Sequence, residues 1–279
     1  MKSFRVGAIA LNPVPANTRV NLANILRWTE RAAGEGVELC LFPEGILSGY
    51  GLTEIDSCSR SIDAVEIREI RAAAERLKVI VSFGLLEKAA EGFYVSQIFT
   101  GPGIFEVYRK CHLTEDEKLK CRAGDRLSVQ DLGFVKVGTQ ICYDSAFLRA
   151  SETLVRRGAE LLFTPTGHAF YTRADEPRDY PRAIEQRRRH VNQYWRTRAY
   201  DFSSYAIYVD NVGETSTGEW YPGYVGVFGP DGSVLAESTT GADALVMADL
   251  DGSFLEKARA EWIGHYRALA DGRPELYDA

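Results

Sequence analysis

Cys142 is the residue whose position in the chain best fits a nucleophile. It ends an apolar stretch that is expected to be a strand (VGTQI) and precedes the segment YDSAF, where a helix is expected to follow. A thiol at such a turn lies near backbone N–H groups and the positive end of a helix dipole, which both favour the thiolate. The same N–H groups can hold an oxyanion. Because a single cysteine in such a turn is more often a small packed hydrophobe, Cys142 alone does not indicate an enzyme.

Two charged residues end other predicted strands. Glu44 follows the apolar run ELCLF and a proline, and Lys110 closes the run IFEVYRK. Each has an ordinary structural explanation, since carboxylates often cap helices and lysines often protect the edges of sheets. Together, however, a Glu, a Lys and a Cys are a set suited to acyl transfer. We expect the Glu to take the thiol proton and later to activate water, while the Lys ammonium and the Tyr143 backbone N–H hold the oxyanion.

The elements that must position these residues occur in the same order in both halves of the chain. The first half is expected to form strands at 4–11, 38–42 and 79–86, helices at 18–33 and 64–77, and a hairpin at 94–110. The second half is expected to form strands at 134–141, 161–164 and 205–209, helices at 146–157 and 178–199, and a hairpin at 224–238, before a last strand at 244–250 and a C-terminal helix. This duplication predicts two sheets packed face to face with helices outside. Since no Pro/Gly/Ser-rich linker interrupts the sequence, we expect residues 1–279 to form a single domain.

Composition argues against several classes of protein. A net charge of −6 with scattered charges gives no footprint for nucleic acid. No apolar run approaches the roughly 20 residues that span a bilayer, and the first residues fit a strand better than a signal peptide, because no small-residue cleavage site follows. The five cysteines form no Cys-x-x-Cys pair and the four histidines lack metal-ligand spacing, so we expect neither a disulfide framework nor a metal site. We therefore expect a cytoplasmic protein with reduced thiols.

Three segments resemble the carbon–nitrogen hydrolase (nitrilase-like) superfamily, namely FPEGILSGY at 42–50, YRKCHL at 108–113 and TQICYDSAF at 139–147. Their order and spacing agree with the Glu–Lys–Cys triad of that family, which would assign Glu44, Lys110 and Cys142 to it. The resemblance implies an α/β fold, a four-layer αββα sandwich in which two mixed sheets pack face to face. It also implies assembly as a homodimer or higher homo-oligomer through the helical face and the C-terminal helix and tail, about 251–279. No metal and no organic cofactor is implied.

Members of that family often have a second glutamate shortly after the lysine. Glu117, seven residues beyond Lys110, matches that place best and would orient the lysine or the attacking water. Glu115 in the same segment, TEDEK, is the competing candidate, and either can instead belong to a solvated acidic loop. Tyr50 matches a family tyrosine near the pocket entrance, with a packing role as the alternative.

The segments beyond the nucleophile depart from the common family pattern. Many members read Cys-Tyr-Asp-x-x-Phe-Pro-Glu, whereas this chain has Leu148-Arg149 in place of the Pro and Glu. The loop after the next strand usually lines the substrate pocket, and it carries an unusual set of candidate substrate-binding residues, Thr166, Gly167, His168 and Phe170. For His168, a loop histidine with only backbone partners is an equally good interpretation.

A long basic helix follows this loop and contains Arg187, Arg188 and Arg189 in succession. One of these arginines can bind a substrate carboxylate, as hydrolysis of a carbamoyl amino acid would require. We favour a solvated helix face with Glu–Arg pairs, or a subunit interface, over this explanation and over nucleic-acid binding. Relatives that bind an amino-acid carboxylate often have an arginine shortly after the cysteine, where this chain has Ser145 and Ala146.

We therefore expect an enzyme that hydrolyses a small linear amide through a thioester at Cys142, releasing ammonia or an amine and then a carboxylic acid. Hydrolysis of an N-carbamoyl amine or amino acid is the alternative. Nitrile hydrolysis is less favoured, because nitrilases tend to have Cys-Trp-Glu where this chain has Cys-Tyr-Asp. A catalytically silent scaffold is the alternative of a different class, and the filled triad positions argue against it.

Overall fold

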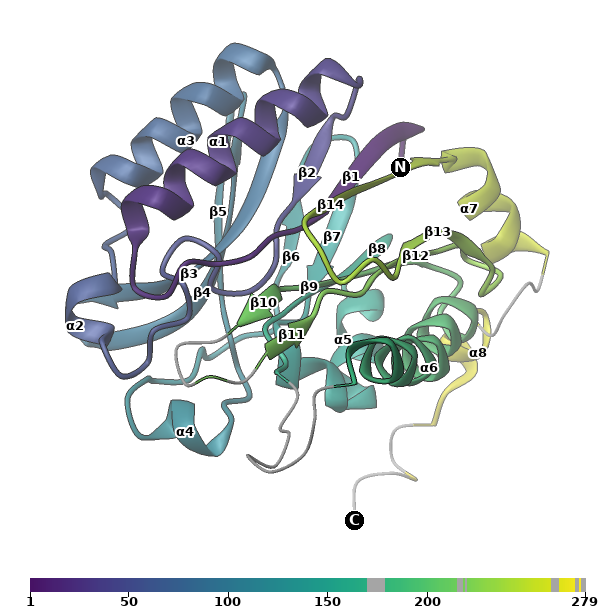
Figure 1. Cartoon of the computed structure of the whole chain (residues 1–279). Coiled ribbons are helices and arrows are strands. Elements are labelled where there is room, and N and C mark those ends of the chain that lie inside the picture. Colours follow the sequence, from purple (N-terminus) through teal and green to yellow (C-terminus); the bar gives the residue numbers. More distant parts are fainter. Residues whose placement is uncertain (170–178, 215–217, 219, 262–265, 274–275, 277–279) are drawn as a thin grey trace.

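Two six-stranded sheets pack face to face, with helices on their outer faces (Figure 1). The computed structural model describes residues 1–169, 179–214, 218, 220–261, 266–273 and 276. Both sheets mix parallel and antiparallel strands. This αββα arrangement confirms the α/β four-layer fold expected from the duplicated pattern and from the family resemblance.

The first sheet has the strand order β14-β1-β2-β3-β4-β5. Its strands are β1 (Phe4–Ala10), β2 (Leu39–Leu41), β3 (Ile80–Ala89), β4 (Gly92–Gly101), β5 (Ile104–Arg109) and β14 (Ala244–Leu250). Helices α1 (Thr18–Gly34) and α3 (Val65–Leu77) cover its outer face. Strands β1, β2 and β3 are parallel, and β4 and β5 follow as antiparallel hairpins, so β5 again runs parallel to β2. The carboxyl ends of β2 and β5 therefore meet at one edge of the sheet.

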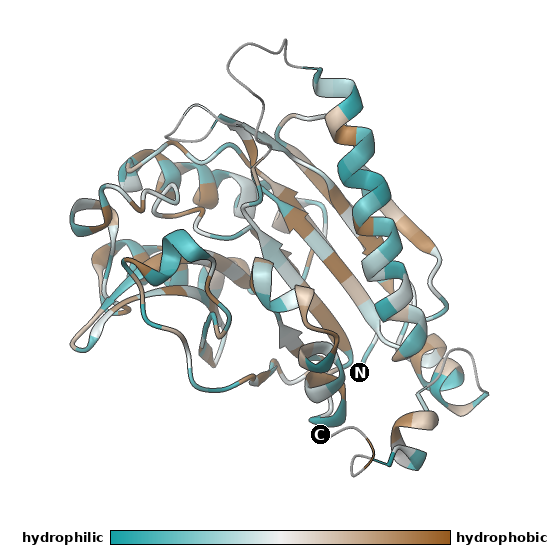
Figure 2. Ribbon diagram, turned by 90° about the horizontal axis from the view of Figure 1, so that it is seen from below, coloured by the Kyte–Doolittle hydropathy of each residue, from teal (hydrophilic) through white to brown (hydrophobic). Residues whose placement is uncertain are grey.

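The second sheet has the order β13-β12-β9-β8-β7-β6. Its strands are β6 (Val129–Asp131), β7 (Lys136–Thr139), β8 (Leu161–Thr166), β9 (Tyr205–Asp210), β12 (Val225–Phe228) and β13 (Val234–Ser238). Figure 2 shows α6 (Tyr180–Asp201) lying along the strands of this sheet, and α5 (Leu148–Arg156) packs beside it on the same apolar cluster. Strands β7, β8 and β9 are parallel, so their carboxyl ends also share one edge.

The amphipathic spacing of the helices accounts for the layers. In α1, Asn17 caps the first turn by accepting a hydrogen bond from the backbone N–H of Val20, and Leu22, Ile25 and Trp28 face the sheet. Such capping satisfies an N–H group that has no partner within the helix. The inner faces of the two sheets supply a separate core of aliphatic and aromatic side chains, between the sheets. Burial of these two apolar surfaces holds the strand ends in place.

The structure adds short elements that hydrophobic periodicity does not reveal. They are α2 (Ile55–Cys58), α4 (Glu115–Lys118), a 3-10 turn η1 (Cys142–Ala146), β6, and the ribbon of β10 (Val212–Glu214) and β11 (Trp220–Pro222). Two C-terminal helices follow, α7 (Gly252–Ala260) and α8 (Ala268–Asp271). The helix expected from residue 146 begins at Leu148, because η1 occupies the preceding turn. The last strand, β14, pairs with β1 and so completes the sheet of the first half.

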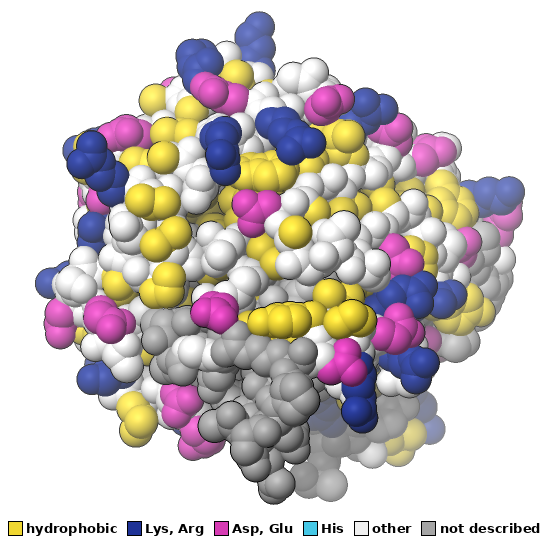
Figure 3. All heavy atoms as spheres, viewed as in Figure 1, with side chains coloured by type: hydrophobic (Ala, Val, Ile, Leu, Met, Phe, Trp, Pro, Cys, Tyr) yellow, Lys and Arg dark blue, Asp and Glu magenta, His cyan; other side chains and the backbone are white. Residues whose placement is uncertain are grey.

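On the face seen in Figure 3, basic and acidic side chains are interspersed and neither sign forms a continuous area. Across the described ranges, the search for helices long and apolar enough to cross a membrane finds none.

Candidate active site

Glu44, Lys110 and Glu117 form one buried ion-paired cluster. The ammonium group of Lys110 donates to Glu44 Oε1 at 2.8 Å and to Glu117 Oε1 at 2.7 Å. All three side chains are at most 1% exposed. An edge-strand lysine that protects the sheet would be solvated, so that explanation of Lys110 is wrong. A buried cation between two carboxylates is an arrangement in which each charge depends on the others.

The first sheet places two members of this cluster at one edge. Lys110 directly follows β5, and Glu44 lies three residues beyond β2. The turn that carries Glu44 lies directly against β3, where a Cβ atom at Gly84 would be 2.3 Å from the backbone nitrogen of Gly45. No side chain fits such an approach, so glycine is required for the Glu44 turn to lie this close.

The second sheet holds the other oxygen of the Glu44 carboxylate. Gly167, directly after β8, donates its backbone N–H to Glu44 Oε2 at 2.8 Å. A Cβ atom at Gly167 would lie 2.9 Å from Asn211 Nδ2, and that amide donates to the backbone carbonyl of Glu44 at 2.9 Å. Both carboxylate oxygens and the backbone of Glu44 are thus fixed from two sheets, which orients the carboxylate before any substrate arrives.

Glu117, and not Glu115, reaches the lysine. Glu117 is fully buried in α4, where its Oε2 accepts the backbone N–H of Thr114 at 2.7 Å and its Oε1 accepts the hydroxyl of Tyr50. Glu115 is exposed and pairs with Lys118 at 2.5 Å. The structure therefore places the candidate glutamate and the candidate tyrosine in one hydrogen-bonded group with Lys110.

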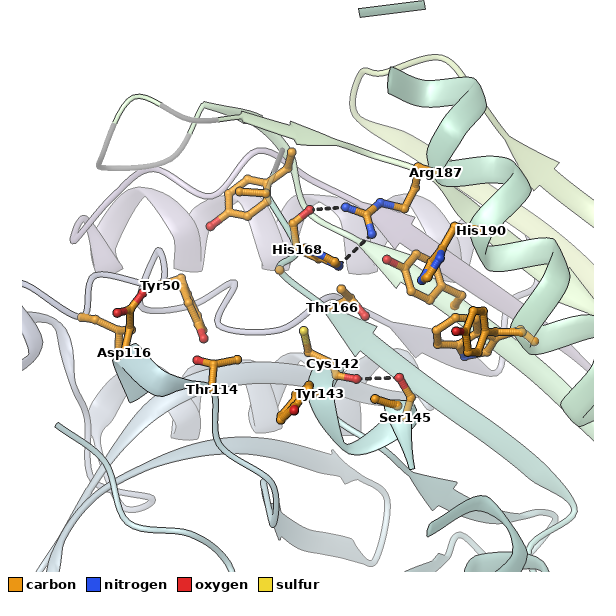
Figure 4. Close-up of a pocket in the computed structure, with 18 of the residues that line it drawn as sticks. Tyr50, Thr114, Asp116, Cys142, Tyr143, Ser145, Thr166, His168, Arg187 and His190 are labelled. Atoms are coloured by element: carbon orange, nitrogen blue, oxygen red, sulfur yellow. Dashed lines mark hydrogen bonds between the residues drawn. The ribbon is translucent and has the colours of Figure 1, made fainter. Parts of the chain in front are cut away.

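Cys142 begins the η1 turn in a strained backbone conformation. Its φ is 45°, in the left-handed region that non-glycine residues seldom adopt. Asp144 closes the turn, because its backbone N–H donates to the carbonyl of Ile141 and its Oδ2 accepts the Ile141 N–H at 3.1 Å. Strain of this kind is kept where the surroundings enforce it, and it often marks functional sites. In Figure 4 the Cys142 sulfur points into a pocket.

Asp144 also joins this turn to the strand end that carries the lysine. It is fully buried and accepts hydrogen bonds from the Tyr108 hydroxyl at 2.8 Å and from the backbone N–H groups of Cys111 and His112 at 3.2 and 2.8 Å. The residues on either side of Lys110 are therefore fixed to the turn of the nucleophile. Sequence reasoning missed Asp144, although its place two residues after Cys142 is a signal that could have found it.

The charges of the cluster set the resting protonation of the site. Burial raises the pKa of the Cys142 thiol, the charge of Glu44 raises it further, and Lys110 only partly opposes them. Burial also raises the pKa of Glu44 against the effect of Lys110. Burial opposes the charge of Lys110, but the two carboxylates hold its pKa above the ordinary value, and Lys110 in turn holds the pKa of Glu117 below it. The expectation of a thiolate stabilised by a helix dipole is therefore wrong, because η1 separates the cysteine from α5 and burial favours the thiol.

We expect the resting enzyme to show no thiolate at Cys142 in neutral solution. The thiolate absorbance in the near ultraviolet should appear only above the ordinary thiol pKa of 9.0, because burial and Glu44 shift the titration upward. Subtracting the pH titration of Cys142→Ser, which lacks this thiol, isolates the signal. A difference in absorbance that is already complete at neutral pH would contradict the assignment of a neutral thiol.

A cavity of about 700 Å³ opens above the thiol of Cys142. In Figure 4, Tyr50, Thr114 and Asp116 lie on one side of the thiol, and His168, Arg187 and His190 lie on the other. The predicted substrate-binding residues that line the cavity are Tyr50, Tyr143, Thr166, Gly167 and His168. The remaining candidate, Phe170, lies outside the described residues.

The three consecutive arginines of α6 do not share one role. Arg188 pairs with Glu237 at 2.9 Å and Arg189 pairs with Glu185 at 3.1 Å, as expected for a helix face with Glu–Arg pairs. That interpretation is wrong for Arg187, whose side chain is 4% exposed and lines the cavity. The same helix also lines the cavity through His190, Tyr194 and Trp195. Their spacing of three, seven and eight residues from Arg187 marks one helix face and could have revealed it.

Within the part of the chain that the structure describes, no group of three His, Cys, Asp or Glu side chains is arranged to hold a metal ion.

The model of the carbon-nitrogen hydrolase family matches residues 5–260. An (R)-stereoselective amidase from a Pseudomonas species is 28% identical over 98% of each chain. The N-carbamoylputrescine amidase of Arabidopsis thaliana is also 28% identical, over 92% of this chain and 88% of its own. Among solved structures, a mutant amidase from Nesterenkonia sp. AN1, with the acetamide moiety of fluoroacetamide added covalently at its active-site cysteine, superposes with a TM-score of 0.79 at 21% identity, over 98% of this chain and 95% of that one. The chain therefore belongs to the carbon-nitrogen hydrolase family, and it is an enzyme that hydrolyses carbon–nitrogen bonds other than peptide bonds.

Proposed function

We propose that the protein hydrolyses a small linear amide through a thioester at Cys142. The observation that carries this proposal is the buried contact of Lys110 with Glu44 and Glu117, beside the cavity into which the Cys142 thiol opens. A nucleophile, a base and a fixed cation at one cavity are the groups that acyl transfer needs. The similarity to amidases that act on non-peptide C–N bonds supports the same reaction.

The first half of the reaction makes the thioester. As the sulfur attacks the amide carbonyl, Glu44 accepts the thiol proton, and the developing oxyanion is held by the Lys110 ammonium and the Tyr143 backbone N–H. Because the pKa values of both Cys142 and Glu44 are raised, the proton is retained until attack begins, and Glu44 is a stronger base than a solvated carboxylate. Collapse of the tetrahedral intermediate breaks the C–N bond, and Glu44 returns the proton to the leaving nitrogen.

The second half regenerates the enzyme. Glu44, again a carboxylate, takes a proton from a water molecule that attacks the thioester carbonyl. The same two donors hold the second oxyanion, the C–S bond breaks, and the sulfur regains a proton as the carboxylic acid leaves. We assign Glu117 and Tyr50 the task of positioning Lys110, since Glu117 shares one oxygen between the Lys110 ammonium and the Tyr50 hydroxyl.

An N-carbamoyl amine is the second candidate substrate, supported by the 28% identity to the N-carbamoylputrescine amidase. The same steps would then give ammonia, carbon dioxide and an amine. The pairing of Arg187 with Asp210 argues against a carbamoyl amino acid, because that arginine is already charge-compensated.

A screen for released ammonia tests the function. Short aliphatic amides, ω-amides, N-carbamoyl amines and nitriles are offered to the purified chain at equal concentration. We expect turnover of amides or carbamoyl amines, and the ratio of the two decides between the candidates. Turnover of nitriles alone, or of none of the four classes, would reject the proposal.

Glu44→Gln is expected to lower turnover about 10²- to 10⁴-fold, because both half-reactions lose the group that carries the proton, and the thioester that still forms slowly at Cys142 should persist. The glutamine keeps the size of the side chain and an oxygen for Lys110, but it cannot take a proton from water. Intact-mass spectrometry after mixing with the best substrate should show the acyl increment, and the double variant Glu44→Gln/Cys142→Ala should not. An increment that persists without the Cys142 thiol would place the adduct elsewhere.

We also propose that residues 1–279 form one domain in a cytoplasmic homo-oligomer. The pairing of β14 with β1 joins the two ends of the chain. The five cysteines are free thiols, as the cytoplasm favours. Leu148, Tyr194 and Tyr200 are 42–50% exposed on the α5–α6 layer, which suits a subunit interface there. Sedimentation velocity measures the assembly directly.

A further inference from the structure

His168 is held at three points by one buried ion pair. Arg187 Nη1 lies 2.8 Å from His168 Nδ1, and Arg187 Nη2 donates to the His168 carbonyl at 2.7 Å. The backbone N–H of His168 donates to Asp210 Oδ1 at 3.2 Å. The side chain of Arg187 is 4% exposed, that of Asp210 is fully buried, and Arg187 Nε lies 3.6 Å from Asp210 Oδ2. Of the two interpretations of His168, the one in which it has backbone partners only is therefore wrong, because Arg187 contacts its ring as well.

The contact with Arg187 determines which ring nitrogen of His168 carries the proton. A guanidinium has only N–H donors and does not lose its proton, so Nδ1 must accept. A neutral imidazole that accepts at Nδ1 carries its hydrogen on Nε2. Burial and the charge of Arg187 lower the pKa of His168 to about 4, which keeps the ring neutral at physiological pH.

The Nε2–H group faces the cavity. Nδ1 and Nε2 lie on different sides of the ring, and Nδ1 is directed at Arg187. Figure 4 shows the imidazole between Arg187 and Cys142. His168 lines the cavity, so that its ring is enclosed by protein on the side of Arg187 and accessible to solvent on the other side. The hydrogen bonds found for His168 among the described residues do not involve Nε2. A fixed donor without a protein partner is available to a substrate.

Charge on this side of the cavity does not favour an anion. On the α6 side of the cavity the cation is Arg187, which belongs to that helix, and the carboxylate of Asp210 neutralises its charge. The other charges close to the thiol belong to Glu44, Glu117 and Lys110, which together add one net negative charge. Asp116 and Lys120 also line the cavity, but they lie in and just beyond α4, on the side away from α6. A substrate carboxylate placed here would lose its hydration without gaining an unpaired cation.

We propose that His168 determines specificity by donating its Nε2–H to an uncharged acceptor, such as an ether, carbonyl or hydroxyl oxygen, on the substrate group that extends from the scissile amide toward α6. This inference rests on the proposed amide hydrolysis and adds the chemical class of the substituent. Arg187 and Asp210 act as positioning residues, since they fix the ring and its tautomer without presenting a net charge.

Matched substrates test the donor. Methoxyacetamide and its homologues one and two methylenes longer are each compared with the amide in which CH₂ replaces the oxygen, namely butanamide, pentanamide and hexanamide. For at least one length we expect kcat/KM to favour the ether by about tenfold, the effect of one net hydrogen bond. In His168→Leu the ratio of the two kcat/KM values should fall to about one, whatever the change in the absolute rates. In His168→Gln, whose amide can still donate, part of the preference should return.

The outcomes separate this inference from the proposed function. Amide turnover without an ether preference at any length, or a preference that survives in His168→Leu, would overturn the role of His168 and leave the amidase intact. A chain that hydrolyses no amide fails the proposed function itself.

A spectroscopic test does not depend on turnover. In ¹⁵N NMR spectra, His168, assigned by its loss in His168→Gln, should show a protonated Nε2 and an unprotonated Nδ1 at neutral pH. An Nδ1–H tautomer or a charged imidazolium would refute the inference.

Discussion

Replacing Cys142 by alanine should reduce amide turnover at least about 10⁴-fold, because a hydrolase without its nucleophile retains only the catalysis that the remaining groups give to water. The fold should be unaffected. Alanine has the same Cβ as cysteine, so the strain at a φ of 45° does not change, and the described structure shows no hydrogen bond made by the Cys142 sulfur. Initial rates of ammonia release, with circular dichroism as the measure of folding, check both expectations.

Cys111 provides the matched control. Its thiol is also partly buried, and it lies next to Lys110, where the sulfur is 3.6 Å from the Tyr108 hydroxyl. Cys111→Ala should keep turnover within about threefold of the unmodified enzyme, since this thiol lies outside the cavity lining and the Tyr108 hydroxyl that it contacts keeps its hydrogen bond to Asp144. If both variants lost turnover equally, replacement of any cysteine in this region would disturb the site. If Cys142→Ala kept a near-normal rate, Cys142 would have no part in the mechanism.

The strand ends could be predicted because they follow from periodicity. Apolar runs of four to eight residues identify β2, β5 and β7, and the residues that follow each run are Glu44, Lys110 and Cys142. The strand directions of the first sheet bring the carboxyl ends of β2 and β5 to one edge, and the packing of the second sheet against the first places Cys142, beyond β7, within reach of the charges of Glu44 and Lys110. The agreement of both halves of the chain with one pattern made the sandwich predictable in the same way.

The side-chain partners that cross between elements were not predicted, because a residue's place in the sequence does not show which distant group it contacts. Asp144 binds the Lys110 loop, and Arg187 turns inward from a helix whose neighbouring arginines face solvent. The Arg-Arg-Arg run alone does not distinguish its buried member, and although the spacing of His190, Tyr194 and Trp195 marks the face of Arg187, it does not reveal the partner Asp210. The prediction of a thiolate at Cys142 was wrong for a related reason. The pKa of this thiol depends on how deeply the surrounding protein buries it and not on its place before a helix.

The buried cluster also explains how a neutral thiol can react. Transfer of the proton from Cys142 to Glu44 removes a negative charge from the carboxylate beside Lys110, while the attack creates one on the substrate oxygen. If the same ammonium holds both, its surroundings need not reorganise as the charge moves, which is the way in which fixed donors lower a barrier. Glu117, with its lowered pKa, stays ionised throughout and keeps Lys110 in place.

Lys110→Met should therefore abolish turnover and destabilise the fold. Methionine fills similar space but leaves the carboxylates of Glu44 and Glu117, at most 1% exposed, without a cation. Removing one partner from a buried ion pair costs about 3–5 kcal/mol in the free energy of unfolding. Turnover should fall by at least about 10²- to 10³-fold, the effect of losing one oxyanion donor. Urea denaturation and ammonia release measure the two losses on the same preparation.

The pH dependence separates the structural from the chemical role of Lys110. Without the ammonium, the pKa values of both buried carboxylates rise above those in the unfolded chain, so the folded state binds more protons and the stability of Lys110→Met should decrease as the pH rises from mildly acidic to alkaline. In the unmodified enzyme the lowered pKa of Glu117 acts in the opposite direction, stabilising the fold above the unfolded pKa and losing that contribution in acid. Lys110→Met/Glu117→Gln removes one of the two unpaired charges, so it should recover much of the stability at alkaline pH. It should not recover turnover, because the cation that holds the oxyanion is still missing. Recovery of turnover together with stability would show that Lys110 serves the fold alone.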